Sequence, residues 1–262
     1  MIVTDDGSES TAETMMRQHY PWARWVAGPR QGPAANRNHG AAHAAGPWFV
    51  FLDDDCLPEP GLIQAYAAVA QRGDRAVLEG RISPIGSRTR LDMECPVNET
   101  GGYLWSCNFA IRRELFEAVH GFDPDFPGAA MEDVELRTRL KKRGVAMEFV
   151  PAAGVLHPWR QRKGTRHIRI HSASVAHYIT KHPEMRARFR TGPVAYGTLR
   201  RLLLELPRAL WSCRGRGLMR EMGLSLYAAI AVTSAVRRAK PAAPVPSHPA
   251  TRIEPDHFRS PS

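Results

Sequence analysis

The sequence predicts an α/β fold in which a mostly parallel sheet is flanked by helices, followed by a basic helical region. In the first part of the chain, short apolar runs alternate with helical patterns, as expected when each strand leads into a helix and then into the next strand. The 262-residue chain has a net charge of +10, but residues 1–157 hold 16 basic and 21 acidic side chains, whereas residues 158–262 hold 20 and 5. We therefore expect an α/β domain over residues 1–160, a basic helical region over 161–238 and a proline-rich disordered tail over 239–262.

Local signals set the boundaries of the predicted elements. Trp48–Leu52 is continuously apolar, as expected of a strand buried on both faces. Pro33 suits the first turn of a helix, and Gly121 and Gly144 are of the residue type that commonly ends one. We expect strands at residues 1–4, 25–27, 48–52, 76–82, 104–111, 146–150 and 155–157. We expect helices at residues 11–19, 33–45, 60–72, 113–120 and 132–143.

The basic region is predicted to form helices at residues 165–181, 194–211 and 217–238. In the second of these, leucines recur at helical spacing: Leu199, Leu202, Leu203, Leu206 and Leu210. Arginines lie among them in the sequence. Such helices suit an anionic membrane surface, and a helical cap docked on the α/β domain explains the pattern as well. The nearly uncharged stretch 222–236 has 15 residues, fewer than the roughly 20 that a spanning helix needs.

The cysteines and the charge pattern limit the location and the partners. The cysteines follow no zinc-site or disulfide spacing: Cys56, Cys95, Cys107 and Cys213. This favours a reducing, cytoplasmic location, with the inner face of the cell membrane as the surface that basic helices would bind peripherally. Because the basic charge is interleaved with leucine-rich helices and no RNA- or DNA-binding module is recognisable, a nucleic-acid partner is not expected.

Acidic residues follow predicted strands, at the edge where open α/β sheets bind their ligands. Asp5-Asp6-Gly7-Ser8 follows the first strand, and Asp53-Asp54-Asp55 follows the apolar one. In an extended segment, Asp53 and Asp55 point the same way and can converge on one hard divalent cation, while Asp54 faces elsewhere. Taken alone, the first cluster also fits a helix cap and the second a solvated loop.

Two further positions, Glu132-Asp133 and His157, are candidate site residues only when they are considered together with these clusters. Glu132-Asp133 opens a predicted helix, where the helix dipole favours acidic residues and where a capping role is the local alternative. His157 ends a strand, and a lone histidine there is more often structural than a ligand.

The clusters belong to a longer series of motifs, which occur in a fixed order. The series is Asp5-Asp6-Gly7-Ser8, Gly32-Pro33-Ala34-Ala35-Asn36-Arg37-Asn38-His39-Gly40, Phe51-Leu52-Asp53-Asp54-Asp55, Asn108-Phe109-Ala110-Ile111-Arg112-Arg113 with Gly121-Phe122-Asp123, Glu132-Asp133-Val134-Glu135-Leu136 and His157-Pro158. With these motifs in this order, residues 1 to about 160 resemble the family 2 glycosyltransferases with the GT-A fold. The resemblance implies transfer of a sugar from a nucleoside diphosphate donor to an acceptor hydroxyl, with inversion at the anomeric carbon.

The resemblance also implies roles for particular residues. Asp133 matches the general base, which takes the proton of the acceptor hydroxyl. Mn²⁺ or Mg²⁺ would be held by Asp53 and Asp55, with His157 as a further ligand, and would offset the charge of the leaving diphosphate. The implied nucleotide-sugar-binding residues are Asp5, Asp6, Arg37, Asp53 and Asp54, and the implied acceptor-side residues are Trp105, Asn108 and Glu132. Cys107 is not expected to be a nucleophile, because no base is identifiable beside it.

The resemblance leaves the substrates and the start of the chain open. A UDP-sugar is the default donor, and glycan, lipid-linked and polysaccharide acceptors all fit. The family normally has a β-strand and a helix before the Asp-Asp-Gly-Ser motif, whereas Met1 lies four residues before Asp5. The chain therefore resembles a family member without its first strand and helix, and we expect in-frame upstream sequence to encode roughly 30 to 50 further residues.

Two other functions fit the same residues less fully. The first is a non-catalytic remnant that still binds sugar nucleotide or membrane. The second is a nucleotidyltransferase, which also binds a nucleotide and a carboxylate-held metal on an α/β sheet but normally has a glycine-rich nucleotide loop near its N-terminus.

Overall fold

A computed structural model describes residues 1–7 and 11–239, apart from the side chains of residues 204–206, 208 and 209. The strands are β1 (Ile2–Asp5), β2 (Arg24–Ala27), β3 (Trp48–Leu52), β4 (Leu57–Pro58), β5 (Val77–Ile85), β6 (Met93–Glu94), β7 (Asn108–Arg112), β8 (Met147–Pro158) and β9 (Arg160–Gln161). The helices are α1 (Glu13–His19), α2 (Pro33–His43), α3 (Leu62–Ala70), α4 (Arg113–Ala118), α5 (Glu132–Lys142), α6 (Thr165–Lys181), η1 (Pro183–Phe189), α7 (Thr191–Arg200), η2 (Arg201–Glu205), α8 (Leu206–Cys213) and α9 (Leu218–Arg238). The tail predicted at 239–262 lies outside the described residues from position 240 onward.

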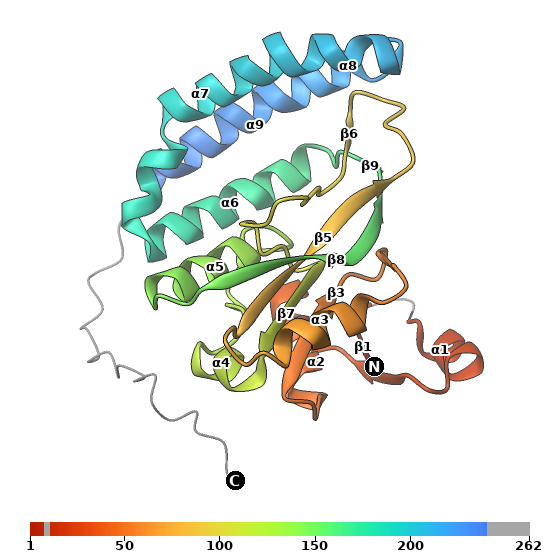
Figure 1. Ribbon diagram of the computed structural model, residues 1–262. Coiled ribbons are helices and arrows are strands. Elements are labelled where there is room, and N and C mark those ends of the chain that lie inside the picture. The colour runs from red at the N-terminus through yellow and green to blue at the C-terminus, as the bar shows by residue number, and fades with distance from the viewer. Residues whose placement is uncertain (8–10, 240–262) are drawn as a thin grey trace.

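The strands form a five-stranded sheet in the order β3-β7-β5-β8-β4 and two smaller sheets (Figure 1). In the large sheet β5 and β8 are parallel, whereas β7 and β4 run antiparallel to their neighbours. β1 and β2 pair in parallel as a sheet of their own. The predicted α/β class is confirmed, but the large sheet is mixed rather than mostly parallel. One reason is that no helix separates β5 from β7, so that the chain can return antiparallel.

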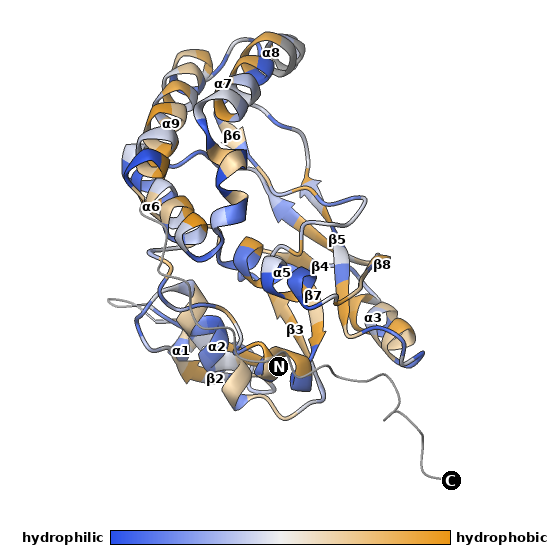
Figure 2. Cartoon of the chain, turned by 90° about the vertical axis from the view of Figure 1, so that its left-hand side faces the viewer, coloured by the Kyte–Doolittle hydropathy of each residue, from blue (hydrophilic) through white to orange (hydrophobic). Residues whose placement is uncertain are grey.

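Helices cover both faces of the large sheet, which is rich in apolar residues (Figure 2). On one face Phe49 and Phe51 of β3 pack in a core that α2, α4 and α5 share. On the other face Trp48 and Val50 of the same strand pack in a second core, to which α3 contributes Tyr66. β3 therefore packs on both faces, as its apolar sequence predicts, although it lies at the edge of the sheet.

The C-terminal helices form a layered cap on this domain. α9 lies along α6, and α7 with α8 lies outside α9, away from the sheet (Figure 1). Phe126 of the α/β domain joins the core between α6 and α9, which contains Tyr178 and Val232. Within the described residues, no helix is long and apolar enough to cross a membrane.

The observed boundaries differ from the predicted ones at several places: the strand predicted at 104–111 begins only at Asn108, and elsewhere one predicted helix is divided and two predicted strands are joined. The helix predicted at 194–211 is divided into α7, a π-helical turn at η2 and α8. The strands predicted at 146–150 and 155–157 are one strand, β8, because β5 and β8 change register between Gly80 and Arg81 and continue pairing beyond that irregularity.

Gly80 occupies a space that is too small for a side chain. A Cβ atom at Gly80 would lie 2.1 Å from Asn108 Nδ2, 2.4 Å from the Ala153 carbonyl oxygen and 2.4 Å from the Tyr66 hydroxyl. We expect Gly80→Ala to lower the free energy of unfolding by about 3 kcal/mol, since two neighbours are backbone or fully hydrogen-bonded groups. Urea unfolding measures this change. Gly223→Ala, in open space within α9, is the matched control and should be neutral or stabilising by up to about 1 kcal/mol.

Candidate active site

The sheet topology brings the predicted polar clusters to one edge. Leu52 at the end of β3 pairs with Asn108 at the start of β7. β5 runs antiparallel to β7, and β8 parallel to β5, with Pro84 opposite His157. The end of β3, the start of β7 and the end of β8 therefore lie at the same edge of the sheet.

Arg37 is the central cation of this edge. Its guanidinium donates to Asp53 Oδ1 at 2.8 Å and to Glu132 Oε1 at 3.0 Å. Its centre also lies 5.7 Å from the centroid of the Phe122 ring. Burial lowers the pKa of Arg37, but Asp53 and then Glu132 and Asp133 outweigh this effect and raise it, so the group stays charged. Arg37 thus joins the aspartate cluster after β3 to the start of α5.

The neighbours of Arg37 anchor α2 on either side. Thr4 Oγ1 donates to Asn36 Oδ1 at 2.7 Å, and Asn36 Nδ2 donates to the Thr4 carbonyl at 3.1 Å. Asn38 donates to the carbonyl of Phe122 at 2.7 Å and accepts from its N–H at 2.9 Å. Three consecutive side chains therefore tie α2 to β1, to the aspartate cluster and to the loop before α5.

Asp133 lies at the start of α5, in a setting that favours its neutral form. Burial and then the neighbouring Glu132 carboxylate raise its pKa to about 6, although N–H groups of Val134 and Ser106 and the charge of Arg37 oppose the change. Met131, just before the helix, has a left-handed φ of 72°, a conformation that costs a non-glycine residue about 1 kcal/mol. Glu132 is buried, and among the described residues its Oε2 atom has no hydrogen-bond partner.

Asp55 and His157 face each other across the other side of the edge. His157 Nδ1 lies 2.8 Å from the Pro158 carbonyl oxygen, an acceptor that suits a proton on Nδ1. His157 Nε2 lies 3.3 Å from Asp55 Oδ2. With the proton on Nδ1, these two atoms are acceptors that a cation can join, and the guanidinium of Arg160 contacts the same carboxylate oxygen.

The donor set at this point suits a divalent cation. One ligand atom each from Asp55, Cys56 and His157 lies within 4.8 Å of the other two. A carboxylate oxygen and an imidazole nitrogen are ligands that Mn²⁺ accepts, whereas a thiolate favours softer ions. Asp53 is not part of this group and pairs with Arg37. Hydrogen bonding with Cys56 and burial raise the pKa of the Cys107 thiol, so that it stays protonated and is a poor nucleophile.

The aspartates predicted to bind the nucleotide hold loops of the chain itself. Asp5 accepts from the N–H groups of Gly7 at 2.9 Å and Ala12 at 2.6 Å. Burial raises the pKa of Asp5, but these N–H groups outweigh it and hold the pKa below its usual range. Asp6 accepts from the N–H groups of Arg30 at 2.5 Å and Gly32 at 2.9 Å. Asp54 is exposed, in line with the predicted alternation.

Trp105 and Asn108, predicted on the acceptor side, have different surroundings. The ring of Trp105 is half-buried and lies 4.8 Å, between centroids, from the exposed ring of Tyr103. Asn108 is buried, accepts from the Tyr66 hydroxyl at 2.8 Å and donates to the carbonyls of Arg81 and Ala153 at 2.9 and 2.8 Å. Asn108 therefore lies behind the site, as part of its support.

Two family models match the chain. One is described as "Glycosyl transferase family 2" and matches residues 1–126, and the other is described as "N-terminal domain of galactosyltransferase" and matches residues 94–162. Over residues 1–126, close to half of its length, the chain matches the family 2 glycosyltransferases.

Curated glucosyltransferases are similar to the chain over most of its length. Validoxylamine A glucosyltransferase of Streptomyces hygroscopicus subsp. jinggangensis (strain 5008) is 26% identical over 236 residues, which cover 71% of this chain and 54% of the relative. The chain thus spans about half the length of the curated relatives it matches.

Two solved structures share the fold of this chain. Mannosyltransferase PcManGT from Pyrobaculum calidifontis, in complex with GDP-Man and Mn²⁺, has a TM-score of 0.54 and 15% identity, covering 88% of this chain and 76% of that chain. S. aureus TarS in complex with UDP-GlcNAc has a TM-score of 0.51 and 16% identity, covering 90% of this chain and 80% of that chain.

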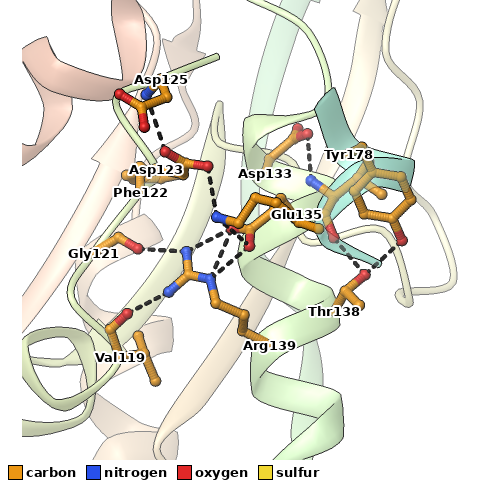
Figure 3. Close-up of polar contacts among 12 residues, drawn as sticks. Val119, Gly121, Phe122, Asp123, Asp125, Asp133, Glu135, Thr138, Arg139 and Tyr178 are labelled. Carbon is orange, nitrogen blue, oxygen red and sulfur yellow. Dashed lines mark hydrogen bonds and ion pairs between the residues drawn. The ribbon is translucent and has the colours of Figure 1, made fainter. Parts of the chain in front are cut away.

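A second ionic network lies along α5, next to the candidate site (Figure 3). Glu135, one turn into α5 and fully buried, pairs with Arg139 at 2.7 Å, Lys181 at 3.1 Å and His182 at 3.2 Å. Burial raises the pKa of Glu135, but the hydrogen bond with His182 and then the charges of Arg139 and Lys181 outweigh it and bring it to about 2. Arg139 also donates to the carbonyl of Gly121 at 2.6 Å. The network fixes α5, and with it Asp133, against α6 and the loop before α5.

Sequence reasoning missed Glu79, which holds the loop that carries Tyr103 and Trp105. Its buried carboxylate accepts from the N–H groups of Gly102, Tyr103 and Leu104, at 2.9, 2.9 and 2.8 Å to Oε2. A single glutamate within an apolar strand is the signal that could have found it, since a buried carboxylate must be paired.

Proposed function

We propose that this chain transfers a sugar from a nucleoside diphosphate donor to an acceptor hydroxyl, with inversion, and that Asp133 is the base. The observation that carries the proposal is the position of Asp133, whose pKa is raised to about 6, among Glu132, Arg37 and Asp53. A carboxylate with such a pKa is ionised at neutral pH and is a stronger base than an ordinary aspartate.

The proposed reaction needs a single base. The acceptor oxygen attacks the anomeric carbon from the face opposite the leaving group, and its proton passes to an oxygen of Asp133. The bond from the anomeric carbon to the phosphate oxygen breaks, and the nucleoside diphosphate leaves with that electron pair. Glu132 Oε2, buried and without a hydrogen-bond partner among the described residues, is free to accept from an acceptor hydroxyl beside the base.

Mn²⁺ or Mg²⁺ would be held by Asp55 and His157. Asp53, of the same aspartate cluster, forms an ion pair with Arg37 instead. A bound divalent ion supplies positive charge that offsets the charge developing on the leaving diphosphate. The facing acceptor atoms of Asp55 and His157 support this assignment, and Arg160, half-exposed, can leave Asp55 without losing solvent contact.

The donor and the acceptor are proposed from their chemistry. Asp5, Asp6 and Asp54 would contact the nucleotide or its sugar, and Tyr103 and Trp105 offer ring faces on the acceptor side. The glucosyltransferase name of the curated relatives makes UDP-glucose the first donor to test, ahead of other UDP-sugars and GDP-mannose. The hydroxyl acceptor is a glycan, a lipid-linked sugar or a polysaccharide.

Replacing the base tests the central assignment. Asp133→Asn keeps the shape and loses the basicity, so we expect sugar transfer to fall by about a hundredfold or more while UDP binding persists. Donor-dependent transfer and UDP titration measure the two effects. Asp125→Asn, an exposed aspartate in the preceding loop, is the control. Unchanged transfer in Asp133→Asn would refute the assignment.

The pH dependence follows from the raised pKa. Asp133 accepts a proton only when it is ionised, so transfer should rise about tenfold per pH unit below pH 6 and level off above it. The rate at saturating donor, measured from pH 4.5 to 8, gives this profile. An acidic limb near pH 4, where an ordinary aspartate titrates, would contradict the environment described for Asp133.

Metal binding can be measured without any reaction. We expect Asp55→Ala to weaken Mn²⁺ binding by about tenfold or more in the absence of donor, since one of two facing ligands is lost. Electron paramagnetic resonance of free Mn²⁺ gives the affinity. Asp54→Ala changes an exposed carboxylate next to it and should leave the affinity unchanged. Equal affinities of the two variants and the unaltered chain would exclude Asp55 as a ligand.

A further inference from the structure

The outermost layer of the C-terminal cap presents an apolar stripe to solvent. Its members recur at helical spacing along α7, η2 and α8, and most are largely exposed: Tyr196 (70%), Leu199 (55%), Leu203 (62%), Leu210 (40%) and Trp211 (91%). The stripe faces away from α9, because Val194 and Leu202, on the other side of these helices, pack inward. We call these five residues the outer stripe. An exposed apolar set of this size marks a surface that binds something.

Three of the leucines in which the sequence suggested membrane binding belong to the outer stripe. Leu202 does not, because it packs against Leu91 and Cys213, and the side chain of Leu206 lies outside the described part. α9 adds a second exposed row with Met222, Leu226 and Ile230. Apolar and polar segments alternate along α7, α8 and α9 (Figure 2).

A basic cavity of about 660 Å³ lies at one end of the outer stripe, between the start of α7 and the end of α9. It is lined by Arg186, Arg190, Arg237, Thr191 and Thr233, and no carboxylate of the described residues lines it. Arg186 is held in place by donating to the carbonyls of Ala239 at 2.8 Å and Val236 at 2.5 Å. Arg237 donates to the Thr191 hydroxyl at 3.2 Å. The cavity therefore offers guanidinium and hydroxyl donors to an anion.

Among the described side chains, the exposed charges of the helices that carry the outer stripe are of one sign, and Glu205 of η2 lies outside the described side chains. Among the described side chains from 185 to 239, Glu221 is the one carboxylate, and it is fully buried between Arg162 at 2.9 Å and Arg201 at 2.7 Å. A second copy of this face would bring arginines against arginines, which disfavours a symmetric dimer. An anionic lipid surface complements both parts, because its head groups attract arginine and its acyl boundary accepts leucine and tryptophan.

We propose that the outer stripe docks on an anionic phospholipid bilayer and that the cavity lined by Arg186, Arg190 and Arg237 takes a lipid phosphate. Tyr196 and Trp211, amphipathic rings near the two ends of the stripe, would lie at the level of the head groups. The proposal concerns a surface remote from Asp133 and does not depend on the reaction proposed for that site.

Vesicle co-sedimentation of the full chain tests the proposal. We expect binding to phosphatidylcholine vesicles that contain about a third phosphatidylglycerol, and about tenfold weaker binding to pure phosphatidylcholine or in about 0.5 M NaCl. The double change Leu203→Ser, Trp211→Ser should reduce binding by about tenfold or more, since it removes two of the side chains that enter the interface. Ile63→Ser, an equally exposed apolar residue on α3, is the matched control and should bind like the unaltered chain.

The cavity is tested by reversing one charge. Arg190→Glu should bind anionic vesicles at least about fivefold more weakly and lose most of the preference for phosphatidylglycerol. Circular dichroism melting shows whether each variant is folded, and Arg190→Gln replaces any variant that is not. Equal binding to neutral and anionic vesicles, no binding, or binding of inorganic phosphate without vesicle binding would each overturn the proposal. So would a dimer, seen by light scattering, that Leu203→Ser, Trp211→Ser dissociates while vesicles stay unbound.

Discussion

The active site depends on one guanidinium, that of Arg37. Asp53 follows a strand and Glu132 opens a helix, and their carboxylates would repel each other at the shared sheet edge without a cation between them. A planar guanidinium can donate to both at once in a fixed geometry, which a lysine cannot do. Asn36, Arg37 and Asn38 leave α2 about 100° apart, so one turn of helix reaches β1, the aspartate cluster and the Phe122 loop. The position of Asp133 relative to Asp55 follows from this one turn.

The uneven charge of the chain has an internal explanation. Two fully buried carboxylates pair across the expected boundary at residue 160. Glu135 of the α/β domain pairs with Lys181, and Asp92 pairs with Arg220 at 3.0 Å. A third buried carboxylate, Glu221, pairs with Arg162 within the basic region. Removing one partner of such a pair leaves a buried charge and costs several kcal/mol. Some basic residues of the second half therefore neutralise buried carboxylates of the first half. These ion pairs stabilise the docking of the cap on the α/β domain. Three further arginines of the basic half, Arg186, Arg190 and Arg237, line the cavity beside the outer stripe.

The sequence predicts the elements well and the long-range contacts poorly. β3 and α6 match their predicted boundaries, because a continuous apolar run and a clear helical period are local signals. Asp53, Asp55 and His157 were predicted at strand ends, and the sheet order brings them to one edge. The contact of Arg37 with Glu132 joins residues far apart in the chain, and nothing near either one indicates it. For the same reason Asn108 was expected to face the acceptor, whereas its amide is used by Tyr66 and two carbonyls.

The balance of charge at the site connects its geometry to its proposed chemistry. Four carboxylates, those of Asp53, Asp55, Glu132 and Asp133, face two guanidinium groups, Arg37 and Arg160. With all four carboxylates ionised, these groups carry an excess of two negative charges, which would repel a diphosphate. One divalent cation between Asp55 and His157 would cancel that excess. The same excess contributes to the raised pKa of Asp133 through Glu132, so neutralising the edge near Asp55 would leave the local basicity at α5 largely in place. The proposed cation site at Asp55 and the proposed proton acceptor Asp133 are thus separate, with Arg37 between them. This separation would allow the same sheet edge to bind an anionic diphosphate and still keep a carboxylate that accepts a proton.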